Sequence, residues 1–80
     1  MNPLSYQDIR DRLMSHALAM SLRVDWIEST RTQRVVLLWD REQVVQGRSV
    51  VPLFPDKTPS LVAVLERDLR HLFGEGWLTS

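Results

Sequence analysis

The spacing of hydrophobic positions changes along this 80-residue chain and divides it into two predicted helices and three predicted strands. From Tyr6 to Met20, apolar side chains recur every three or four residues, the spacing of one helix face. Ser5 precedes this segment and Asp8 follows three residues later, a pattern typical of a helix N-cap with a capping box. We therefore expect an amphipathic first helix that packs on another part of the chain.

After the first helix, apolar and polar residues alternate with a period of two, which is typical of a half-buried strand. It predicts a strand over 22–28, a polar loop over 29–32 and a second strand over 33–39. A four-residue loop that closes an antiparallel hairpin places Trp26 opposite Val35 and brings the apolar residues of both strands to one face. On this register the helix-facing side consists of Leu22, Val24, Trp26, Val35, Leu37, Trp39 and Val44.

A third strand is predicted after a polar turn at 40–43, with Val44 opposite Trp39. Its alternation is lost around Gly47, and a glycine inside a strand pattern indicates a β-bulge. Pro52 has no N–H to donate, so it fits only an edge strand or a strand end. The third strand is therefore expected at an edge of the sheet.

The second helix is predicted to begin with Thr58 as N-cap and Pro59 as its first residue. Gly74 is a natural C-cap, and Trp77 and Leu78 are apolar enough to fold back onto the body. The apolar stripe of this helix consists of Leu61, Leu65, Leu69 and Leu72.

These elements predict a single α+β domain over residues 1–80, in the order helix, three strands, helix. The simplest arrangement that buries both helix stripes is a three-stranded antiparallel meander with two helices packed on one face. The alternative, one helix on each face, leaves no apolar sheet surface exposed.

The sheet face opposite the helices is predicted to be an interaction surface. A solvent-facing strand is normally polar, whereas this face combines an apolar centre with an arginine rim, as protein interfaces do. Its predicted members are Ile27, Val36, Leu38, Val45, Arg23 and Arg34.

Ten basic residues balance ten acidic ones, so no overall field draws the chain to nucleic acid or an anionic membrane. There is no cysteine, which excludes disulfides and thiolate metal sites. The first residues lack a cationic start followed by an apolar run, so we expect no secretory signal and a cytoplasmic location.

No motif predicts catalysis, a cofactor, a metal or a small-molecule substrate. His16 and His71 are the only histidines, one on each predicted helix, and no closely spaced ligand accompanies either. We therefore expect no catalytic, cofactor-binding or metal-binding residues and no enzymatic activity.

The order of elements resembles that of the double-stranded RNA-binding domain. That family presents a lysine-rich start of its second helix to phosphates, and binding a polyanion requires several such cations. The corresponding stretch here, Asp56-Lys-Thr-Pro-Ser-Leu-Val, has one lysine beside an acid. A modest basic stripe across the sheet remains available from Arg23, Arg34, Arg41 and Arg48.

The expected function is a small non-enzymatic protein-interaction module, an adaptor or an inhibitor or regulator of a larger protein. Its partner is expected to be another protein or a second copy of the chain. The alternatives are a weak nucleic-acid-binding domain and a homodimeric structural protein.

Overall fold

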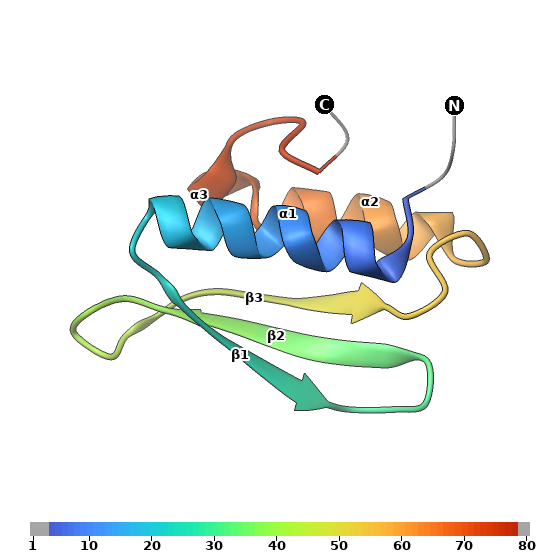
Figure 1. Cartoon of the computed structure of the whole chain (residues 1–80), viewed down its shortest axis with the longest axis horizontal. Coiled ribbons are helices and arrows are strands. Elements are labelled where there is room, and N and C mark those ends of the chain that lie inside the picture. The colour runs from blue at the N-terminus through green and yellow to red at the C-terminus, as the bar shows by residue number, and fades with distance from the viewer. Residues whose placement is uncertain (1–3, 79–80) are drawn as a thin grey trace.

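Within residues 4–78, three helices lie on one side of a three-stranded antiparallel sheet (Figure 1). The computed structural model describes residues 4–78. The predicted α+β class, the meander and the placement of the helices on one face are confirmed. The elements in chain order are α1 (Tyr6–Ala19), β1 (Arg23–Glu28), β2 (Gln33–Trp39), β3 (Val45–Pro52), α2 (Pro59–Asp68) and α3 (Arg70–Phe73).

The first helix, α1, begins as its sequence predicts. The Ser5 hydroxyl accepts a hydrogen bond from the Asp8 backbone N–H at 3.1 Å, and the Ser5 N–H donates to the Asp8 carboxylate at 3.0 Å. This reciprocal capping box satisfies two backbone donors that a helix start leaves unpaired. The inner stripe of Ile9, Leu13 and Ala17 is buried against the sheet side of the molecule.

The second predicted helix is interrupted at Leu69, whose φ of −110° and ψ of 7° separate α2 from α3. Pro59 is its first residue as predicted. Thr58 is the N-cap residue as predicted, but its side chain makes no capping hydrogen bond. Its hydroxyl donates instead to the Phe54 carbonyl at 3.1 Å. Gly74 ends α3 with a φ of +90°, a conformation that favours glycine.

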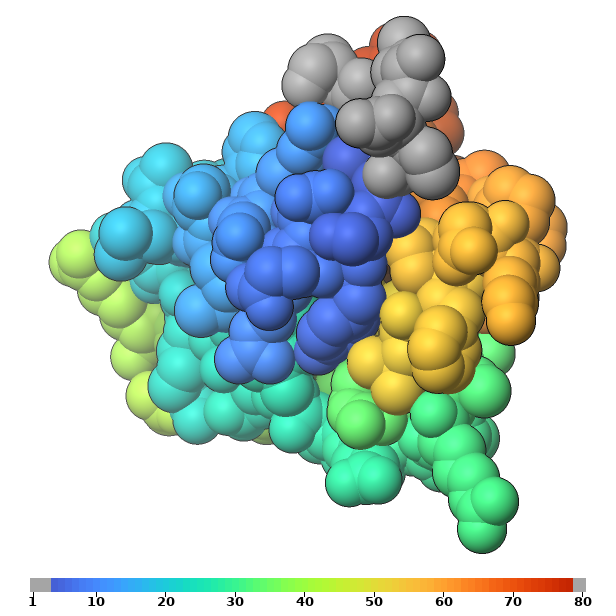
Figure 2. All heavy atoms as spheres, turned by 45° about the vertical axis from the view of Figure 1, so that its right-hand side comes forward, coloured from blue at the N-terminus to red at the C-terminus, as the bar shows by residue number. Residues whose placement is uncertain are grey.

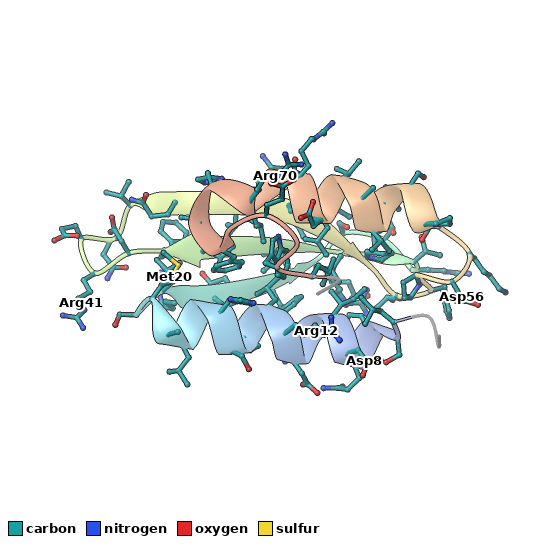
Figure 3. The ribbon with its side chains drawn as sticks, turned by 90° about the horizontal axis from the view of Figure 1, so that it is seen from above. Asp8, Arg12, Met20, Arg41, Asp56 and Arg70 are labelled. Atoms are coloured by element: carbon teal, nitrogen blue, oxygen red, sulfur yellow. The ribbon has the colours of Figure 1, made fainter. Side chains whose placement is uncertain are left out.

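The C-terminal segment folds back over the helices, as predicted. Trp77 and Leu78 are both buried, and the Trp77 indole N–H donates to the Glu66 carbonyl at 2.9 Å. The Arg12 guanidinium on α1 donates to the Leu78 carbonyl. Figure 3 shows this segment passing between α1 and α2, with the labelled Arg12 beside it.

The first hairpin differs from prediction by one residue. Trp26 pairs with Val36 instead of Val35, because the pairing of β1 with β2 begins at Arg34. Gln33, the first residue of β2, has no partner in β1 and belongs to the loop of this hairpin. The Gln33 carbonyl accepts hydrogen bonds from the Thr30 N–H at 3.4 Å and from the Ser29 hydroxyl at 3.2 Å. The loop of this hairpin is therefore 29–33, one residue longer than the predicted loop, 29–32.

This shift exchanges the two faces of β2, because side chains alternate along a strand. Val36 and Leu38 point to the helices, and each has 0% of its surface exposed. The prediction that they lie on the uncovered face is wrong, and so is the prediction that Val35, Leu37 and Trp39 face the helices.

The second hairpin contains the predicted bulge. Trp39 pairs with Val45, and Leu38 pairs with Gly47, so Gln46 is the extra residue. Val44, predicted opposite Trp39, belongs to the turn. A Cβ atom on Gly47 would lie 2.8 Å from a Leu72 methyl group and 2.9 Å from a Leu69 methyl group. A larger residue here would therefore require these two leucine side chains to shift.

The start of α1 lies beside the segment after β3, as Figure 2 shows in blue and yellow. Leu4 and Tyr6 from the first part and Leu53 and Pro55 from the second line a shallow hollow there. Within residues 4–78, none of the helices has both the length and the apolar character that a membrane crossing requires.

Candidate interaction surface

The most distinctive surface of the molecule is the side of the sheet that faces away from the helices. In the described part of the chain, residues 4–78, all the helices lie on the other side (Figure 1). We call this surface the open face. Its members are Arg23, Asp25 and Ile27 from β1, Val35, Leu37 and Trp39 from β2, and Val45, Arg48 and Val50 from β3.

Strand pairing arranges these nine side chains in three rows across the sheet. Each row has an apolar residue of β2 at its centre, so the middle strand presents a continuous apolar line. The rows are Ile27–Val35–Val50, Asp25–Leu37–Arg48 and Arg23–Trp39–Val45.

The apolar side chains at the edges of the open face are accessible to solvent. Ile27 is 47% exposed and Val45 is 42% exposed, while Leu37 on the central strand is half-buried by its neighbours. Val44 in the adjoining turn adds another side chain that is 53% exposed. A contiguous apolar patch with charged residues at its edges is the usual sign of an interaction site on a small domain.

Arg23 is held flat on the open face by its neighbours. Its guanidinium carbon lies 5.1 Å from the centre of the Trp39 ring, and its Nη1 lies 3.3 Å from the Asp25 carboxylate. Nη2 donates to the Gln43 side-chain oxygen at 3.3 Å. Because this ion pair is exposed, it contributes little to stability, but it orients the arginine over the indole.

Arg48 is different, because it makes no ion pair and no side-chain hydrogen bond with any residue in the range 4–78. It is exposed and stands beside Leu37 in the middle row. With respect to residues 4–78, the Arg48 guanidinium is therefore available to a carboxylate of a binding partner.

The structure separates the six residues predicted for this surface. Arg23, Ile27 and Val45 lie on the open face, and their role in binding stays a prediction. Val36 and Leu38 are in the core. Arg34 lies on the helix side of β2, where its Nη1 donates to the Thr30 carbonyl at 3.0 Å and the Gln33 carbonyl at 3.3 Å. The sequence prediction assigned Val35, Leu37 and Trp39 to the wrong face and omitted Arg48 and Val50.

The four arginines suggested as a basic stripe do not share a surface. Arg23 and Arg48 are on the open face, whereas Arg34 is on the helix side of its strand. Arg41 lies in the turn and donates to the Ser21 hydroxyl at 3.2 Å. The cationic line that phosphate binding needs is therefore not formed by these residues.

The histidines are engaged in contacts with other parts of the fold. His16 stacks on Phe73 with ring centres 5.1 Å apart and meets Trp77 edge-on at 5.8 Å. His71 Nε2 lies 2.8 Å from the Gln46 carbonyl oxygen, which links α3 to the bulge. Among residues 4–78, no cluster of three or more His, Asp or Glu side chains has the arrangement to hold a metal ion.

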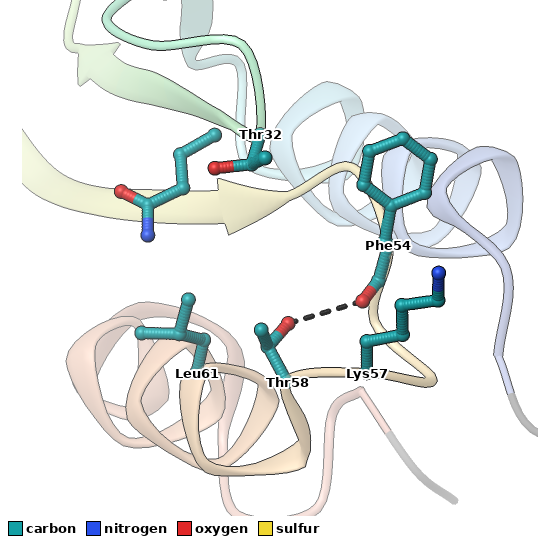
Figure 4. A pocket seen from close by; sticks show the side chains of 6 residues that line it. Thr32, Phe54, Lys57, Thr58 and Leu61 are labelled. Atoms are coloured by element: carbon teal, nitrogen blue, oxygen red, sulfur yellow. Dashed lines mark hydrogen bonds between the residues drawn. The ribbon is translucent and has the colours of Figure 1, made fainter.

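One pocket lies between the loop before β2 and the start of α2. Figure 4 shows this pocket of about 160 Å³, lined by Thr32, Phe54, Lys57, Thr58 and Leu61 together with Gln33. The Thr58 hydroxyl that points into this region already donates to the Phe54 carbonyl (dashed in Figure 4). Pockets for drug-sized ligands generally measure about 300–1,000 Å³, so this hollow is small for a ligand.

No family model, curated protein or solved structure matches this chain.

Proposed function

We propose that this chain is a non-enzymatic protein-interaction module that binds through the open face, as an adaptor or as a regulator of a larger protein. One observation carries the proposal. Within residues 4–78, the helices all lie on one side of a sheet whose central strand is apolar, so the other side presents an apolar patch to solvent (Figure 1).

Burial of the exposed apolar side chains at this surface favours binding. Complete burial of a Val or Ile side chain is worth about 1.5–3 kcal/mol relative to exposure. Ile27 and Val45 are each nearly half exposed, so covering them contributes about 1 kcal/mol apiece on the same scale. The remaining apolar members of the face add to this amount.

The composition of the open face also supports protein binding. Tryptophan and arginine are the residue types that most often dominate binding energy at protein interfaces. Here the Arg23 guanidinium is already stacked on Trp39. A side chain that is ordered before binding loses less conformational entropy on association.

Site-specific photo-crosslinking tests the proposal. A photoreactive phenylalanine derivative at Ile27, on the open face, is expected to capture a protein in cells that naturally express the chain. The same group at Leu18, which is 81% exposed on α1, is the matched control and is expected to capture it much less.

The captured protein is then purified and titrated with the unmodified chain and with an Ile27→Asp variant. We expect the variant to raise the Kd at least tenfold, about 1.4 kcal/mol, because a carboxylate is desolvated in the apolar contact. Equal capture at both positions, or an unchanged Kd, would show that the open face is not the binding surface.

A further inference from the structure

We infer that the open face binds a second copy of this chain, face to face, about a two-fold axis parallel to the strands. The inference rests on the proposed function, because it names the partner of the same surface. It is carried by the charge pattern of the middle row, Asp25–Leu37–Arg48.

The middle row carries opposite charges at its two ends. Asp25 is on edge strand β1, Arg48 is on edge strand β3, and Leu37 lies between them. Neighbouring strands are about 4.8 Å apart, so the two charged residues are separated by about twice that distance. Arg48 makes no ion pair with any residue from 4 to 78. Within the same residues, Asp25 forms an ion pair with the exposed guanidinium of Arg23.

A two-fold rotation about an axis along β2 makes this pattern self-complementary. It places Leu37 of one protomer against Leu37 of the other and lays β1 of each protomer over β3 of its partner. Asp25 then faces Arg48 across the interface, and the pair occurs twice. Packed sheets are about 10 Å apart, a gap that an arginine and an aspartate side chain together span.

The outer two rows fit the same rotation. Ile27 faces Val50, and Arg23 faces Val45 with the aliphatic part of its side chain. Val35 and Trp39 lie near the axis, each against its own copy. The interface thus has an apolar centre with two symmetric ion pairs, and no position brings like charges together.

A two-fold axis perpendicular to the strands gives the opposite result. That rotation lays β1 over β1 and β3 over β3, so Asp25 faces Asp25 and Arg48 faces Arg48. Like charges held opposite one another oppose association. The charges therefore select the axis parallel to the strands.

The size of the open face predicts a weak dimer. The face is three strands wide, with about 4.8 Å between strands, and roughly six residues long, with a rise of about 3.3 Å per residue. Its projected area is therefore on the order of 300 Å². Stable interfaces bury about 800 Å² per partner. We therefore expect a dimer that forms and dissociates with concentration in the micromolar range or above.

Charge exchange tests the inference through sedimentation equilibrium. Asp25→Arg places two arginines opposite one another in the dimer, and Arg48→Asp places two aspartates opposite one another. Each variant alone is expected to dimerise at least tenfold more weakly than the unmodified chain. An equimolar mixture of the two variants is expected to recover dimerisation, because every pair in the mixed dimer joins an arginine to an aspartate.

Arg41→Asp is the matched control, since it makes the same change of charge in the turn, away from the three rows. We expect its dimerisation to equal that of the unmodified chain, and circular dichroism checks that all variants are folded. A mixture that stays as weakly associated as its components, or an unmodified chain that is monomeric up to millimolar concentration, would overturn the inference.

The same results separate this inference from the proposed function. A monomeric chain that is crosslinked to a different protein through position 27 overturns self-association and supports the proposed function. A monomeric chain that is crosslinked to nothing through that position overturns both.

Discussion

Leu37 and Leu38 are adjacent in the sequence and have opposite surroundings in the fold. Leu38 is fully buried against the helices, next to Gly47 on β3. Leu37 is half-buried on the open face, between Asp25 and Arg48. The two leucines are therefore expected to contribute very differently to the free energy of unfolding.

Leu38→Ala is expected to lower the free energy of unfolding by about 2–5 kcal/mol, because it removes buried methyl groups and leaves a cavity. Leu37→Ala is expected to lower it by about 1 kcal/mol or less in the monomer, because solvent and flexible side chains fill the space. Urea unfolding of both variants at high dilution measures the difference. Equal losses, or a larger loss for Leu37→Ala, would contradict the observed register.

At the scale of the residue, the sequence predicts positions whose role is local. Ser5 and Asp8 form their capping box, Pro59 begins its helix and Gly74 ends one, because each depends on the backbone conformation of its own segment. The faces of β2 could not be predicted in this way. Residues 35–38 are all apolar, so alternation does not distinguish the two sides.

The turn between β2 and β3 is organised by one side chain at the scale of the element. The Asp40 carboxylate accepts hydrogen bonds from the backbone N–H groups of Glu42 at 2.8 Å and Val44 at 3.0 Å. It also accepts one from the Gln46 side-chain amide at 2.7 Å, which ties the turn to the bulge. Gln43 has a φ of +65°, a conformation uncommon for this residue type.

The hydrogen bond from the Val44 backbone N–H is the main cause that lowers the pKa of Asp40 below its ordinary value of 3.8, with Gln46 and Glu42 adding to it. The pKa of Asp8 is also lowered, first by the Ser5 backbone N–H and then by the Ser5 hydroxyl. A carboxyl whose pKa is lower in the folded state stabilises the fold at pH values above its unfolded pKa. That stabilisation is lost as the pH falls through the folded pKa.

We expect the chain to lose stability as the pH falls below about 3.8, the ordinary value for both carboxyls. Asp40→Asn keeps a side-chain oxygen for the backbone N–H groups but does not titrate, so its stability should fall less over the same range. Thermal unfolding midpoints between about pH 5 and pH 2.5 compare the two proteins. Parallel pH profiles would mean that Asp40 is not coupled to folding.

Element types and order were predictable because long periodic segments distinguish helix from strand. The errors lie at connections. The loop after β1 incorporates Gln33 through hydrogen bonds to its carbonyl, which residue types do not reveal. The division between α2 and α3 at Leu69 occurs inside a continuous leucine stripe, so the periodic pattern gives no sign of it.

At the scale of the whole molecule, the fold is one-sided. The C-terminal segment, with Trp77 and Leu78 buried, completes the core on the helix side, and the open face receives no comparable cover within residues 4–78 (Figure 1). The sequence correctly predicted an apolar uncovered face, because the strands are apolar on both sides. It could not identify its members, because that depends on a one-residue difference in loop length.

The faces of β2 and the self-association of the open face can be measured together by the attenuation of methyl NMR signals of residues 35–38 by a soluble paramagnetic probe, recorded over a dilution series. At low concentration we expect the signals of Val35 and Leu37 to be attenuated and those of Val36 and Leu38 to be protected. At high concentration the first pair should become protected as the open faces meet. Attenuation of the Val36 and Leu38 signals, or protection of the Val35 and Leu37 signals at every dilution, would show that Val35 and Leu37 do not form an uncovered face of the monomer.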